Sequence, residues 1–157
     1  MSFNHFDESG NAVMVDVSMK TPTMRTAIAG ALLTLKPETV QSIVSGRVAK
    51  GDVLGVARLA GIAGVKRTPE LIPLSHPLAI HHVAIDFKVD EENGRIELLA
   101  TVRAFERTGV EMEAMTAASI AALTVYDMCK GTDKGIVISD ISLHYKEGGK
   151  SGVYRKP

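Results

Sequence analysis

The 157-residue chain has no tryptophan, a single cysteine, no net charge and no long apolar segment, and each shortage excludes a class of protein. With Cys129 alone, no intrachain disulfide can form, which suits the reducing cytoplasm. No apolar segment approaches the ~18 residues that a membrane helix needs, and the polar, acidic start of the chain is unlike a signal peptide. We therefore expect a cytoplasmic protein that does not contact a membrane.

Basic and acidic residues number 18 each, so the chain lacks the basic excess with which nucleic-acid binders contact phosphates. Three tyrosines and four phenylalanines are too few to indicate platforms for stacked bases. We expect no nucleic-acid partner, although zero total charge leaves room for a local basic pocket. Length and composition are those of one globular domain. We expect a flexible arm over residues 1–12 and a single domain over residues 13–157, whose end, residues 146–157, is a glycine- and lysine-rich tail.

Hydrophobic periodicity and turn signals predict an α+β domain with helices on one face of a mostly antiparallel sheet. The pattern leaves residues 21–35 undecided. Asn93-Gly94 is a strong hairpin signal, and Asp52 is a candidate N-cap for a helix so rich in alanine and glycine that another element must pack closely against it. The expected elements are a strand at 13–18, helices at 37–45 and 52–68, a loop at 70–78, hairpin strands at 79–89 and 95–105, a helix at 111–130 and a strand at 135–145.

The helix expected at 111–130 carries no charge between Ala114 and Tyr126. A helix that is apolar all round is usually buried on several sides. In a domain with one sheet, we expect the second cover to come from another copy of the chain, which predicts a homo-oligomer.

A polar stripe nevertheless runs along this helix, because Glu113, Thr116, Asp127 and Lys130 fall within an arc of about 100°. Asp127 and Lys130, three residues apart, can form an ordinary surface ion pair. Alternatively they transfer protons, since burial would raise the pKa of the carboxyl group and lower that of the lysine towards neutral pH. The sequence leaves both interpretations open.

His76 lies in a loop, LIPLSHPL, in which prolines on both sides of Ser75-His76 restrict the backbone. A rigid loop histidine is a better site candidate than His81 or His82, which point to opposite faces of a strand and cannot easily bind one metal. The alternative for His76 is a hydrogen-bonded packing role. No zinc-binding motif is present.

The closing GGKS, residues 148–151, suggests a P-loop but does not form one. The first glycine of that motif would have to stand where His144 stands, and too few residues follow for the required helix. Two interpretations remain: a solvated basic tail, or a flexible phosphate contact made by Lys146 or Lys150 with freely accessible glycine N–H groups.

Three blocks together resemble the MoaC family, the cyclic pyranopterin monophosphate synthases of molybdenum-cofactor biosynthesis. They are KRTPELIPLSHPL (66–78), TGVEMEAMTAASIAALTVYDMCK (108–130) and GGKSG (148–152), and MVDVS (14–18) and KGDVL (50–54) also fit. The resemblance covers residues 14–152. It implies a ferredoxin-like α+β fold and a homohexamer, a trimer of dimers with sites at subunit interfaces.

The resemblance also implies a lyase that takes (8S)-3',8-cyclo-7,8-dihydroguanosine 5'-triphosphate, a small molecule made by the preceding radical enzyme. The product is cyclic pyranopterin monophosphate, and pyrophosphate is released. No cofactor is implied, and magnesium accompanying the triphosphate is left open, because the sequence has no dedicated ligand cage. Two rivals are a non-catalytic nucleotide- or pterin-binding regulatory domain and an oligomerisation module, but every charged residue of the motifs is present.

Carried over residue by residue, the resemblance assigns no metal ligand and two kinds of site residue. Catalysis falls on Asp127, Lys130 and Lys50. Substrate binding falls on Leu74, Ser75, His76, Met112, Glu113, Arg25 and Lys146. Ser75 stands where the family commonly has cysteine, so a thiol nucleophile is excluded there. The implied mechanism is acid–base catalysis inside a cationic clamp that holds the triphosphate.

Overall fold

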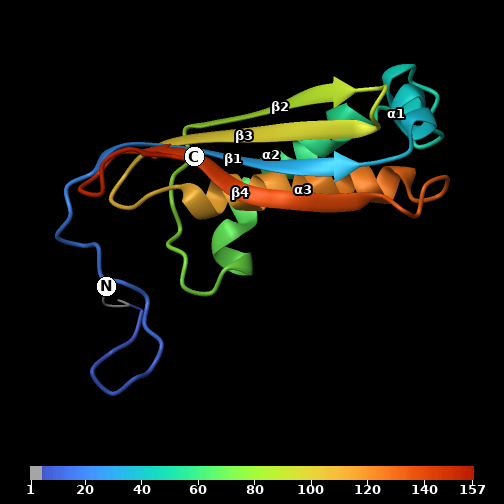
Figure 1. Ribbon diagram of the computed structural model, residues 1–157. Coiled ribbons are helices and arrows are strands. Elements are labelled where there is room, and N and C mark those ends of the chain that lie inside the picture. Colours follow the sequence, from blue (N-terminus) through green and yellow to red (C-terminus); the bar gives the residue numbers. More distant parts are fainter. Residues whose placement is uncertain (1–4) are drawn as a thin grey trace.

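A computed structural model describes residues 5–157 as a five-stranded antiparallel sheet with two long helices on one face (Figure 1). The elements in chain order are β1 (Thr23–Thr34), α1 (Pro37–Val44), α2 (Val53–Leu71), β2 (His82–Asp90), β3 (Arg95–Glu106), α3 (Glu111–Cys129), β4 (Val137–Glu147) and β5 (Tyr154–Arg155). The strand order is β2-β3-β1-β4-β5, and all neighbours are antiparallel. Apart from the short α1 and β5, this is the ferredoxin-like βαββαβ arrangement, which confirms the predicted fold class.

The segment that the sequence left undecided is β1, the central strand. Its inward side chains, Ala27, Ala29, Ala31 and Leu33, are buried under the helices. From Ala27 to Leu33 this strand is apolar on both faces, because it pairs on both edges and its outer face is partly buried. This stretch therefore lacks the alternation that identifies a half-exposed strand.

Close packing of α2 on α3 confirms the expectation drawn from the glycines and alanines of α2. A Cβ atom at Gly61 would lie 3.0 Å from the carbonyl oxygen of Ala117 and would clash with Ile85. Part of the cover that we expected from a second copy is therefore supplied by α2. Apolar side chains still face outwards, for example Leu59 on α2 and Leu123 on α3, which are 69% and 54% exposed.

Two local predictions were wrong. Residues 13–18 form no strand, because no neighbouring strand accepts their hydrogen bonds among the described residues. Helix α2 continues past Thr68 to Leu71, since Pro69 lies in its last turn, where the loss of one helical hydrogen bond is tolerated. The tail begins inside β4, which continues to Glu147, and β5 pairs with Tyr145 and Lys146. Within the described chain, no helix has the length and apolar character to span a membrane.

Candidate functional site

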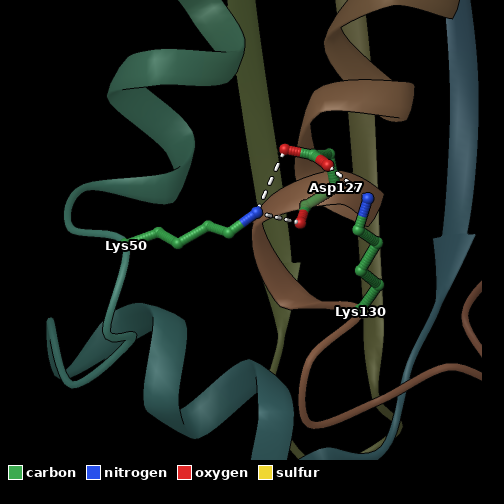
Figure 2. Close-up of polar contacts among 3 residues, drawn as sticks. All are labelled: Lys50, Asp127 and Lys130. Carbon is green, nitrogen blue, oxygen red and sulfur yellow. Dashed lines mark hydrogen bonds and ion pairs between the residues drawn. The ribbon is translucent and has the colours of Figure 1, made fainter.

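One candidate cluster joins the end of α3 to the loop before α2 (Figure 2). The Nζ atom of Lys50 donates to the carbonyl oxygen of Asp127 at 2.8 Å and lies 3.2 Å from its Oδ2. The Nζ atom of Lys130 lies 2.6 Å from Oδ1 of the same carboxylate. The predicted Asp127–Lys130 ion pair is confirmed, and the structure adds Lys50 as a second cationic partner.

The charge state of this cluster is opposite to the one expected from burial. The Asp127 side chain is 57% exposed, so desolvation has little effect on it. Hydrogen bonds from Lys130 and then Lys50 lower the pKa of Asp127, and the hydrogen bond to Asp127 raises the pKa of Lys130. The cluster therefore holds an ionised Asp127 carboxylate beside a protonated Lys130, and the Lys50 amine is its second hydrogen-bond donor.

The buried carboxylate with a raised pKa lies instead at Glu113, in the first turn of α3. Glu113 is 2% exposed, and its Oε1 atom has no hydrogen-bond partner among the described residues. Burial raises its pKa to about 7, and the neighbouring Glu111 carboxylate contributes in the same direction. A group that titrates near neutral pH can both accept and donate a proton.

Lys146, at the end of β4, reaches the start of α3 and forms a 2.6 Å ion pair with Glu111. Both side chains are about one quarter exposed, 28% and 26%. Glu111 was not among the site residues predicted from the sequence, although it belongs to the same GVEMEA block as Glu113. Lys150 is exposed on the glycine loop that follows β4.

The proline-bracketed loop and the start of α3 line one cavity of about 340 Å³. The Nε2 atom of His76 lies 2.7 Å from the carbonyl oxygen of Val15. Val15 belongs to residues 14–20, which follow the arm expected at residues 1–12 and which we call the N-terminal arm from here on. The structure thus brings together the predicted substrate-binding residues of two separate motifs, which are Leu74, Ser75, His76, Met112 and Glu113.

Arg25 lies in an adjoining, larger cavity of about 690 Å³ that Lys146, Lys150 and the glycine loop also line. Arg25 is 9% exposed, and its guanidinium group donates to the carbonyl oxygens of Glu106 and Arg107, both at 3.1 Å. Lys20 and Arg107 add two cations that no motif indicated. Five basic residues therefore line this cavity against two carboxylates, Glu111 and Glu147, and positive charge is in excess, as a polyphosphate site requires.

Lys50, Asp127 and Lys130 form the first cluster, at the end of α3, and His76 and Glu113 with the cavities around them form the second, at its start. Asp127 follows Glu113 by 14 residues, which is about 21 Å along a helix axis. Figure 1 shows α1 and the end of α3 at the right, whereas the N-terminal arm and the loop at 72–81 lie at the left. A single chain therefore does not bring the Lys50–Asp127–Lys130 cluster to the molecule that His76 and Glu113 would contact.

No group of three or more His, Cys, Asp and Glu side chains within residues 5–157 is arranged to hold a metal ion. What the two clusters offer is proton transfer and anion binding on a ferredoxin-like scaffold, which is the chemistry of an acid–base enzyme with a charged substrate.

The MoaC family model matches residues 14–149, and the chain belongs to this family. A protein of Geotalea uraniireducens (strain Rf4) named "Cyclic pyranopterin monophosphate synthase" is 72% identical over 99% of this chain and 98% of the relative. A protein with the same name from Rhodospirillum rubrum is 55% identical over 96% of this chain and 90% of the relative. A third protein of this name, from Clostridium perfringens (strain 13 / Type A), is 55% identical over 96% of this chain and 95% of the relative.

Among solved structures, a complex of a mutant of the ferredoxin protease FusC with Arabidopsis ferredoxin matches with a TM-score of 0.37 and 20% identity. The match covers 66% of this chain and 10% of that chain, and at this TM-score it supports no inference.

Proposed function

We propose that this chain is a cyclic pyranopterin monophosphate synthase, a lyase of molybdenum-cofactor biosynthesis. It rearranges the cyclised dihydro-GTP supplied by a preceding radical enzyme into cyclic pyranopterin monophosphate and releases pyrophosphate. Membership of the MoaC family across residues 14–149 and full-length relatives of that name support this activity over a non-catalytic binding domain. We place the reaction in the cytoplasm, because the substrate derives from GTP.

The observation that carries the site proposal is the placement of the two charged clusters at opposite ends of α3. Two copies related by a twofold axis with their α3 helices antiparallel bring the first cluster of one copy to the second cluster of the other. Each dimer then holds two composite sites, and three dimers make the proposed hexamer. The exposed apolar side chains Leu59 and Leu123 provide outward surface for such contacts.

Each half of the composite site has its own chemistry. The cations around the larger cavity, with Arg25 beneath them, bind the triphosphate and stabilise the charge that develops as pyrophosphate leaves. Lys130 and Lys50 donate protons during ring opening and closure, and the Asp127 carboxylate orients both amines. Glu113 exchanges a proton with the base or sugar from its buried position.

Complementation between two inactive variants tests the composite site. Asp127→Asn disables the first cluster and His76→Gln disables the second. In a 1:1 mixture of random dimers, half of the dimers are mixed, and each mixed dimer has one intact site. Reassembled mixtures should recover about a quarter of the wild-type turnover, measured as pyrophosphate release and pterin fluorescence.

The control is each variant unfolded and refolded alone, which should stay inactive. A mixture as inactive as its components, despite confirmed subunit exchange, would mean that both clusters act within one chain. Wild-type protein that assembles but forms no pterin would contradict the synthase activity itself.

A further inference from the structure

We propose that the N-terminal arm, residues 14–20, forms part of the substrate site and positions a substrate-binding side chain there. It forms one wall of the 340 Å³ cavity, and its Val15 carbonyl group orients the imidazole ring of His76. This inference rests on the proposed function, in which His76 contacts the substrate. The arm is then a positioning element of the site and not a flexible segment without a role.

The contact between Val15 and His76 determines which ring nitrogen carries hydrogen. A carbonyl oxygen can only accept a hydrogen bond, so the 2.7 Å contact requires a hydrogen on Nε2. In the neutral ring, Nδ1 is then left with its lone pair free for a substrate donor. The two residues are 61 positions apart, so this bond exists only when the arm folds back onto the loop.

The same arm encloses the cavity. Val15, Val17 and Lys20 line it from the arm, together with His76 and Glu113. Without the arm, the buried carboxyl group of Glu113 and the imidazole of His76 would face solvent on that side.

A second contact holds the arm against the domain, although the arm belongs to no strand. The Nε atom of Arg107 donates to the carbonyl oxygen of Lys20 at 3.1 Å. Within the arm, the Asp16 carboxylate accepts from the backbone N–H of Ser18 at 2.8 Å and closes a turn. The arm contributes no residue to the buried core, and β1 starts only at Thr23, so the domain should fold without it.

The chain provides a matched pair of truncations, because residues 14 and 19 are both methionines. A chain that starts at Met14 keeps the Val15 carbonyl group, whereas a chain that starts at Met19 lacks it. Comparing these two variants isolates residues 14–18, since both lack the first 13 residues. Thermal melting and sedimentation establish that both are folded and assembled alike.

Two measurements report on His76: the NMR signal of its imidazole ring and the kcat of the enzyme. Nitrogen-15 NMR of the imidazole rings should detect a slowly exchanging Nε2–H proton in the full chain and in the Met14 chain, assigned by its loss in His76→Gln. In the Met19 chain this proton should exchange too fast to detect. The kcat of the Met19 chain should be at least about tenfold below that of the Met14 chain, because a misplaced catalytic-site group can cost that much.

An unchanged Nε2–H signal and equal kcat values in the two truncated chains would overturn the proposal. If the full chain forms no pterin yet the NMR signal depends on residues 14–18 as expected, the synthase activity fails while the positioning of His76 stands. The NMR readout therefore separates the two claims.

Discussion

Replacing Glu113 with glutamine should remove a pH dependence from the stability of the protein. Glu113 is 2% exposed, and one of its carboxylate oxygens has no hydrogen-bond partner among the described residues. Burial therefore favours the neutral acid and raises its pKa from 4.5 to about 7. Glutamine has nearly the same size and cannot ionise, so only the titration is lost.

The direction of this pH dependence depends on where Glu113 is protonated in the folded and in the unfolded chain. Below pH 4.5, Glu113 is protonated in both the folded and the unfolded chain. Between pH 4.5 and about 7, the unfolded chain has released this proton while the folded chain still holds it, so rising pH favours unfolding. The free energy of unfolding should fall by about 1.4 kcal/mol per pH unit, about 3 kcal/mol in total, because of this one group. Above about pH 7 the contribution is constant.

Urea unfolding at several pH values between 4.5 and 8, at one protein concentration, measures this effect in wild type and Glu113→Gln. Other groups titrate in both proteins, so the informative quantity is the difference between them. That difference should shift by about 3 kcal/mol in favour of the variant from low to high pH. A difference that stays constant across the range would refute the assignment of Glu113 as a buried acid that is half-ionised near pH 7.

The remaining predictions concern the two charged clusters and the helix packing. Asp127→Asn should lower kcat by roughly 10²–10⁴-fold, since the uncharged amide no longer holds Lys130 and Lys50 in place, and sedimentation should show unchanged assembly because asparagine has nearly the same size as aspartate. Lys146→Gln should raise the KM for substrate more than Lys150→Gln, because only the former leaves the partly buried Glu111 carboxylate unpaired; equal effects would contradict this. Gly61→Ala should destabilise the fold by about 1–3 kcal/mol in chemical unfolding, whereas Gly131→Ala, where an added Cβ meets nothing within 4 Å, should change it by less than about 0.5 kcal/mol.

Features encoded by neighbouring residues were predictable from the sequence. The Asn93-Gly94 turn lies between β2 and β3, Asp52 caps α2 through the N–H of Gly55, and α3 runs from Glu111 to Cys129 as its pattern indicated. The Asp127–Lys130 ion pair also followed, because three helical positions place two side chains on one face. The MoaC motifs can likewise be recognised without coordinates.

Tertiary structure alone decided which carboxylate is buried and which site residues meet. Asp127 and Glu113 lie on the same helix, but the first faces solvent between two lysines and the second is covered by the surrounding elements, so their pKa values shift in opposite directions. The arm contact to His76 and the separation of the two clusters by the length of α3 also carry no local signal. Helical and strand periods depend on residues a few positions apart, whereas exposure and the distance between motifs depend on how layers from distant parts of the chain pack together.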